Sequence, residues 1–223
     1  MEHVQTERCA LSFSGGKDSM LALDRAVRQG LQVDYLFTLY EATNNRVRFH
    51  GVHIDLIQAQ ADALGIPLLK YPYQSNDFEA VFLSTLNDLH QRGISTILFG
   101  NIHLADVRAW YEQRTNAIGF IHREPLWGEP PSALVCEFIA RGYLAVLTCI
   151  ELTHSNPAWL GRTLTNTLVR AFEQAGIDAC GERGEYHSFV HVGPLFKKPL
   201  PIRLGQTYLM PGNARFLLQE INL

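Results

Sequence analysis

Short apolar runs alternate with segments of helical periodicity through the first hundred residues. Residues 9–13, 33–40, 68–71 and 96–99 are apolar enough for buried strands. Between these runs, apolar residues recur at spacings of three and four. They are Met20, Leu23, Ala26 and Val27, then Ile54, Ile57, Ala61 and Leu64, then Phe78, Val81, Phe82, Leu86 and Leu89. The pattern predicts four strands alternating with three helices.

This alternation predicts an α/β fold with a doubly wound, mostly parallel, Rossmann-like sheet. Asn76, followed three residues later by Glu79, predicts a capping box at the start of the third helix. In such sheets ligands bind beyond the carboxyl ends of the strands. Gly15 and Gly100 both follow predicted strands, so we expect them at the ligand-binding edge.

The second half of the chain has a different pattern, after a proline-rich break at residues 125–131. Apolar periodicity predicts a helix, a strand and a second helix, and period-two alternation then predicts three strands. Their expected ranges are 133–141, 143–150, 162–175, 186–192, 202–210 and 215–223. We therefore predict a smaller α+β lobe, with one domain over residues 1–122 and a second over residues 123–223.

Composition and charge narrow the class of protein. The net charge is −3, which argues against broad nucleic-acid binding, since that usually needs a basic surface. The four cysteines are widely spaced, without a CxxC pair, so we expect reduced thiols and a cytoplasmic location. The polar start lacks the apolar run of a signal peptide, and no apolar stretch has the length of a membrane span.

The segment from Ser14 to Ser19, sequence SGGKDS, is the main candidate for chemistry. Two glycines between a strand and a helix allow backbone N–H groups to approach an anion, and the helix start adds partial positive charge. Lys17 adds a full charge, and the two serines add hydroxyl donors. Asp18 is interpreted as a helix cap or a Mg²⁺ ligand. The segment is not a Walker A loop, because Leu11 and Asp18 replace residues which that pattern requires.

The motif SGGxDS after a first strand resembles the PP-loop ATP pyrophosphatase superfamily. The resemblance implies that the loop, formed by Ser14, Gly15, Gly16, Lys17, Asp18 and Ser19, holds the pyrophosphate when ATP is cleaved between its α and β phosphates. It also implies that residues 1–122 form a PP-loop ATP-binding domain and that residues 123–223 bind the substrate.

Further segments resemble the diphthine–ammonia ligase family over nearly the whole chain. They are Phe49–Gly51, Pro125–Trp127, Gly181–Ser188 and Gly193–Phe196. The resemblance implies an AMP-forming ligase that adenylates the carboxylate of diphthine on elongation factor 2 and amidates it with ammonia. The chain departs from the family pattern at Asn101, Arg183 and Ser188. Residues 100–110 look more like bacterial members, some of them proposed to act in corrinoid salvage, so the acceptor stays open.

The resemblance and the glycine loop together indicate which residues are candidates for catalysis, ATP binding and Mg²⁺ binding. We expect catalytic roles for Lys17, Asp18, Glu182 and Glu185. We also expect ATP contacts from His50, Gly100 and Asn101, and Mg²⁺ binding at Asp18. His187 and His191 are about 13 Å apart on a strand, too far to share a zinc ion. ATP, Mg²⁺, ammonia and a carboxylate are the expected ligands, and a homodimer is possible.

Two other hypotheses fit the same loop. A tRNA-modifying PP-loop enzyme would need a basic RNA-binding face, which the net charge of −3 disfavours. A nucleotide-binding sensor without turnover would not need Lys17, Asp18 and Ser19 together. The sequence therefore favours the ligase.

Overall fold

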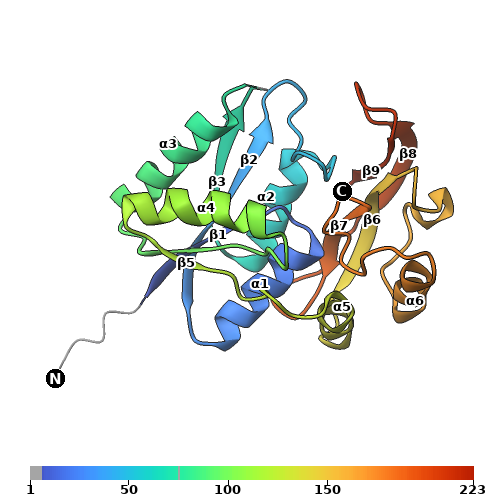
Figure 1. Cartoon of the computed structure of the whole chain (residues 1–223), viewed down its shortest axis with the longest axis horizontal. Helices are drawn as coiled ribbons and strands as arrows, with labels where there is room; N and C mark the ends of the chain where they lie inside the picture. Colours follow the sequence, from blue (N-terminus) through green and yellow to red (C-terminus); the bar gives the residue numbers. More distant parts are fainter. Residues whose placement is uncertain (1–6, 75) are drawn as a thin grey trace.

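The computed structural model describes residues 7–74 and 76–223. The fold contains two sheets, which lie side by side in Figure 1. Five parallel strands form the first sheet. In spatial order they are β3 (Leu68–Tyr73), β2 (Gln32–Glu41), β1 (Arg8–Ser12), β4 (Thr96–Leu98) and β5 (Ile121–Arg123). The order reverses at β1, as in doubly wound folds. The predicted α/β class is confirmed.

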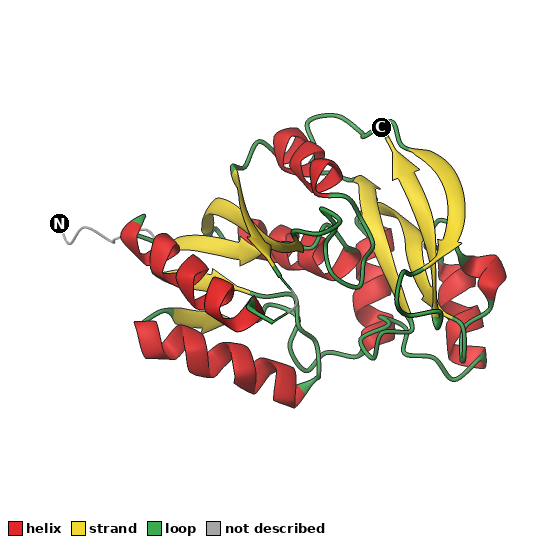
Figure 2. Ribbon diagram, turned by 90° about the horizontal axis from the view of Figure 1, so that it is seen from above, coloured by secondary structure: helices red, strands yellow, loops and turns green. Residues whose placement is uncertain are grey.

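Helices cover both faces of this sheet, as Figure 2 shows. Residues of α1 (Lys17–Arg28) and α2 (Ile54–Leu64) pack in one apolar cluster. Residues of α3 (Phe78–Gln91) and α4 (Ala105–Ile118) pack in another. Across residues 7–74 and 76–223, no helix has both the length and the apolar character needed to cross a membrane.

The second sheet is antiparallel and belongs to the C-terminal half. Its order is β7 (Tyr186–Val192), β6 (Leu144–Glu151), β9 (Phe216–Asn222) and β8 (Arg203–Leu209). Two helices, α5 (Pro131–Ala140) and α6 (Asn166–Gln174), and the short 3₁₀ helix η1 (Pro157–Trp159) accompany it. The predicted α+β character is confirmed. The larger apolar cluster joins both halves, because it contains Leu11 and Leu21 together with Leu147 and Phe189.

Three elements were not predicted from the sequence: the short 3₁₀ helix η1, helix α4 and strand β5. Helix α4 buries only Thr115 fully, so its apolar periodicity is weak. Strand β5 has three residues, Ile-His-Arg, and lies at the sheet edge. Both α4 and β5 are formed by packing against neighbours: α4 contacts α3 and β5, and β5 pairs with β4.

The predicted capping box at the start of α3 is wrong. The N-cap residue is Asp77, and no side chain caps the helix. Asp77 Oδ1 instead accepts a hydrogen bond from the Gln74 N–H at 2.6 Å, so it stabilises the preceding turn. Helix α6 begins at Asn166 and not near Arg162, because the Thr165 hydroxyl accepts from Leu168 N–H and caps it.

Candidate active site

A cavity of about 280 Å³ opens where the carboxyl edge of the parallel sheet meets β7. Its walls come from both halves of the chain. Its lining residues include Ser12, Ser14, Lys17, Asp18, Ser19, Phe49, His50, Gly100, Asn101, Tyr111, Cys180, Glu182, Tyr186, His187 and Ser188. The volume is near the lower end of the range for small-molecule pockets. A smaller cavity of about 100 Å³ shares Ser12, Ser14 and Tyr111 with it.

The glycine turn connects β1 to α1 at the floor of this cavity. Gly15 has φ +78°, a conformation that favours glycine, and Gly16 is the N-cap of α1. The N-terminal end of α1 therefore faces the cavity with its partial positive charge. Ser14 and Ser19 place their hydroxyl oxygens 3.4 Å apart beside it. This arrangement can hold an anion.

Gly16 is needed for close packing around the turn. A Cβ atom there would lie 2.7 Å from His50 Cε1 and 3.2 Å from the Ser188 carbonyl oxygen. Gly100 is close to the same region, because its Cβ would lie 3.0 Å from Ser19 N. Strand β4, the loop before α2 and β7 therefore all approach the start of α1.

Gly16→Ala is expected to lower the free energy of unfolding by about 1–3 kcal/mol. It is also expected to weaken the binding of ATP, the ligand that the sequence predicts, because His50 and β7 must move. Denaturant unfolding and calorimetric ATP titration measure the two effects. Gly128→Ala is the control: its added Cβ meets nothing within 4 Å, although its φ of +77° strains the backbone by about 1 kcal/mol. Wild-type ATP affinity in Gly16→Ala would contradict the expectation.

Lys17 is almost fully buried, with 3% of its side chain exposed. Its Nζ atom donates to Asp18 Oδ2 at 2.9 Å and to the Cys180 carbonyl oxygen, and it lies 4.6 Å from the centre of the Tyr186 ring. Burial alone would lower the pKa of Lys17, but Asp18 and Tyr186 outweigh it and hold the pKa well above its ordinary value. Lys17 is therefore a permanent cation that ties the loop to the C-terminal half.

Asp18 lies in the first turn of α1 and does not cap it, so the capping interpretation is wrong. Its carboxylate accepts from Lys17 Nζ, and a quarter of its side chain remains exposed. Burial raises the pKa of Asp18, and the charge of Lys17 offsets only part of this effect.

Strand β7 is joined to the loop by backbone and side-chain hydrogen bonds. Val190 N–H donates to the Gly15 carbonyl oxygen at 3.0 Å, and Lys17 N–H donates to Ser188 Oγ at 3.2 Å. The buried Gln60 amide donates to both the Gly15 and the Val190 carbonyl oxygens, at 2.9 and 2.6 Å. The C-terminal half therefore contributes directly to the site.

The Glu182 side chain lines the cavity, and the pKa of its carboxyl group is raised. Burial raises the pKa of Glu182 to about 7, and the negative charge of Asp18 adds to the increase. The Ile102 N–H and the charge of Lys17 oppose it. A group that titrates near neutral pH can accept or donate a proton during a reaction.

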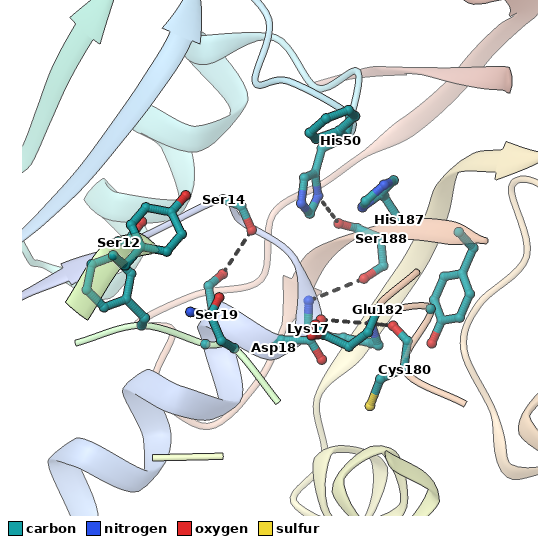
Figure 3. Close-up of a pocket in the computed structure, with 17 residues that line it drawn as sticks. Ser12, Ser14, Lys17, Asp18, Ser19, His50, Cys180, Glu182, His187 and Ser188 are labelled. Carbon is teal, nitrogen blue, oxygen red and sulfur yellow. Dashed lines mark hydrogen bonds and ion pairs between the residues drawn. The ribbon is translucent and has the colours of Figure 1, made fainter. Parts of the chain in front are cut away.

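Two neutral histidines, His50 and His187, form another part of the cavity wall (Figure 3). The rings of His50 and His187 have centroids 4.6 Å apart, and His50 Nδ1 lies 3.4 Å from the Ser188 carbonyl oxygen. Burial lowers the pKa of His50 to about 4 and lowers the pKa of His187 well below its ordinary value, and Lys17 contributes to both. Neither ring carries charge at neutral pH, so both can offer hydrogen bonds without repelling Lys17.

Asn101 is held in one orientation by a buried carboxylate. Its Nδ2 donates to Glu124 Oε1 at 2.7 Å, and His122 Nε2 lies 3.1 Å from the same oxygen. Glu124 is 2% exposed and His122 is 3% exposed. Because Glu124 accepts from the amide nitrogen, the Asn101 carbonyl oxygen is left available as a hydrogen-bond acceptor for a ligand in the cavity.

The structure brings most predicted site residues together but separates Glu185 from them. Ser14, Lys17, Asp18, Ser19, His50, Gly100, Asn101 and Glu182 line the cavity, and Gly15 and Gly16 form the turn beneath it. Glu185 instead lines a second cavity with Glu151 and Arg215, and its Oε2 accepts from the Arg183 N–H at 3.0 Å. Its catalytic role stays a prediction that the geometry does not support.

Several lining residues were missed by sequence reasoning. Tyr111 lies on α4, the helix that was not predicted, so no pattern could place it at the sheet edge. Tyr186, His187 and Ser188 lie at the end of the Gly181–Ser188 segment, where the alternation of β7 could have indicated them. Phe49 precedes His50 directly and lines the cavity with it.

The fold and the site together define the class of protein. A parallel sheet whose first strand leads through Ser14, Gly15 and Gly16 into a helix, with Lys17 at the start of that helix, is the PP-loop arrangement of α/β proteins. The N-terminal domain of diphthamide synthase matches residues 7–121, and the C-terminal domain of diphthamide synthase matches residues 130–215. The chain belongs to the diphthamide synthase family.

Curated relatives agree with this membership. The diphthine–ammonia ligase of Rattus norvegicus is 24% identical over 93% of this chain and 87% of its own length. The diphthine–ammonia ligase of Danio rerio is 25% identical, over 91% and 89%. Among solved structures, the U34-tRNA thiolase NcsA from Methanococcus maripaludis is 14% identical with a TM-score of 0.40, over 81% of this chain and 71% of that one. A likeness this low carries no information about function.

Proposed function

We propose that this protein is an ATP-dependent ligase that joins ammonia to a carboxylate and releases AMP and pyrophosphate. One observation carries the proposal. The phosphate-binding turn with Lys17 opens on the same cavity as Glu182, a carboxyl group with a pKa of about 7. Family membership and the activity named for the relatives support it.

The proposed reaction has two steps, with ATP as a substrate. A carboxylate oxygen attacks the α-phosphorus atom, and pyrophosphate leaves toward the turn, where α1 and Lys17 stabilise its charge. Ammonia then attacks the activated carbonyl carbon, the C–N bond forms, and AMP leaves. In this second step Glu182 accepts the proton that ammonium or the attacking nitrogen must lose. Cleavage of ATP thus converts the unreactive carboxylate into an acyl adenylate, from which AMP is a good leaving group.

The residues at the turn fit a Mg²⁺ ion bound mainly by ATP phosphates. Mg²⁺ prefers carboxylate and phosphate oxygens and keeps several waters, so one or two protein carboxylates suffice. Asp18 would hold it, because it lines the cavity and a quarter of its side chain is exposed. When bound, the ion would neutralise phosphate charge.

The two halves would then divide the substrates between them. We assign ATP to residues 1–122 and the acceptor carboxylate to residues 123–223, which contribute Glu182, His187 and Ser188 to the cavity wall. Diphthine, named for the relatives, is the first acceptor to test. A cytoplasmic location and a homodimer stay predictions.

The test is incubation of the purified protein with ATP, Mg²⁺, ammonium chloride and one acceptor at a time. The acceptors are elongation factor 2 carrying diphthine and small corrinoid carboxylates. The expected products are AMP, pyrophosphate and an amide, measured by nucleotide chromatography and mass spectrometry. An ammonia-free reaction is the control for uncoupled hydrolysis. Release of ADP and phosphate in place of AMP would overturn the proposal.

A further inference from the structure

Arg48, Phe49 and His50 form a strained γ-turn at the edge of the cavity. The His50 N–H donates to the Arg48 carbonyl oxygen at 2.8 Å, and the central residue, Phe49, has φ +66°. This conformation is rare for a bulky side chain, and residues held in such regions cost about 1–3 kcal/mol. Strain of this size persists where the surroundings impose it, and it concentrates at functional sites.

The surroundings hold this turn rigidly. Val47 and Val52 pair across its base, with Val47 N–H donating to the Val52 carbonyl oxygen at 2.9 Å. Thr148 Oγ1, on β6, donates to the His50 carbonyl oxygen at 3.0 Å. His50 and Phe49 both line the main cavity, and Phe49 remains 52% exposed. The turn therefore places Phe49 and His50 in the wall of the main cavity. Arg48 lies beside them and lines a neighbouring cavity of about 260 Å³, which Phe49 also lines.

Arg48 is the charged residue of this turn, and its guanidinium group has no acidic partner among the described residues. Its guanidinium lies over the Phe49 ring, 4.8 Å from the ring centre, and its side chain is exposed. Within residues 7–74 and 76–223 it makes no side-chain hydrogen bond or salt bridge. Its positive charge nevertheless reaches the cavity wall: burial raises the pKa of Tyr111, and Arg48 partly opposes that increase.

The cavity itself has too little positive charge for a triphosphate. Among its lining residues Lys17 is the one permanent cation, and Asp18 already pairs with it. Glu182 adds negative charge above pH 7, and His50 and His187 are neutral. ATP keeps a net negative charge with one Mg²⁺ bound, so a further cation at the edge of the site would strengthen its binding.

We propose that Arg48 is a phosphate-binding residue, whose guanidinium leaves the face of Phe49 and pairs with the polyphosphate of ATP at the cavity edge. The rigid γ-turn fixes the backbone of Arg48, so that its long side chain can extend toward the phosphates. The planar guanidinium group can then donate two parallel hydrogen bonds to phosphate oxygens. The inference rests on the proposed function in taking ATP as the ligand, and it adds a residue that the glycine turn does not supply.

The experiment compares binding of ATP, ADP and AMP, each with Mg²⁺, to the wild type, Arg48→Gln and Arg48→Lys by calorimetry. Removing a charged hydrogen bond weakens binding by roughly tenfold to a hundredfold. We expect a loss of this size for ATP in Arg48→Gln, a smaller loss for ADP and none for AMP. Arg48→Lys is expected to recover part of the ATP affinity, since it keeps the charge but not the planar group.

Arg170→Gln is the matched control, because Arg170 is exposed on α6 and does not line the cavity. It removes the same charge and is expected to bind all three nucleotides as the wild type does. Unchanged ATP affinity in Arg48→Gln would overturn the inference and leave the proposed function intact. An equal loss for ATP and AMP would also overturn it, since Arg48 would then act on the nucleoside or the loop. Wild-type protein that fails to bind ATP would overturn the proposed function itself.

Discussion

Replacing Lys17 by methionine is expected to reduce AMP formation by about a hundredfold to a thousandfold, the usual effect of removing one group that stabilises transition-state charge. Lys17 is the one permanent cation among the residues that line the cavity, and its Nζ also binds the Cys180 carbonyl oxygen. The variant therefore loses both the charge near the leaving pyrophosphate and a link between the two halves. The measurement is AMP release under saturating ATP.

The same replacement is expected to affect stability. Asp18 loses its cation, and because a quarter of its side chain is exposed, the free energy of unfolding is expected to fall by roughly 2 kcal/mol, less than for a fully buried pair. Lys70→Met is the control, because Lys70 is exposed on β3, away from the cavity. Full ATP turnover in Lys17→Met would contradict the assignment of the site.

Replacing Glu182 by glutamine is expected to lower activity while raising stability. With a pKa of about 7, the wild-type carboxyl group gains its function as a base as pH rises through 7. At a constant concentration of free NH₃, the rate of amide formation is therefore expected to increase with pH across this range in the wild type. In Glu182→Gln the rate is expected to fall by roughly 10²–10⁴-fold and to lose this pH dependence.

The stability effect has the opposite sign. The folded-state pKa of Glu182 is raised from the ordinary 4.5 to about 7, so below pH 4.5 the group is protonated in both states and costs nothing. As pH rises from 4.5 to 7, Glu182 loses its proton in the unfolded chain but keeps it in the folded protein. The free energy of unfolding therefore falls, and the total loss above pH 7 is about 3 kcal/mol. Glutamine removes this cost, so at pH 8 the variant is expected to resist urea better than the wild type.

Glu173→Gln separates these effects from a general change in charge. Glu173 is exposed on α6 and does not line the cavity. Its replacement is expected to leave both the pH–rate profile and the pH dependence of urea unfolding as in the wild type. A Glu182→Gln enzyme that keeps the wild-type rise in rate near pH 7 would refute the role of Glu182 as base.

Local sequence determined the strand–turn–helix unit at the start of the chain. An apolar strand, two glycines and an amphipathic helix follow one another between Arg8 and Arg28, and nearby residues constrain one another through the backbone. The predicted phosphate-binding turn therefore matches the observed β1, Gly15–Gly16 and α1. The same reasoning missed α4 and the capping geometry of α3, because α4 has little apolar pattern and Asp77 turned its side chain toward Gln74.

Tertiary structure decided what surrounds the turn. Glu182 and Glu185 are equivalent in the sequence, yet only Glu182 faces the cavity, because the chain turns between them and joins β7 to the loop through Val190 and Ser188. The His50–His187 pair joins residues far apart in the chain, and no local periodicity encodes such a contact. The sequence by itself determined that the protein has a turn able to hold phosphate. Long-range packing decided which acids, imidazoles and amides face it, because burial and neighbouring charge, and not residue type alone, set their chemistry.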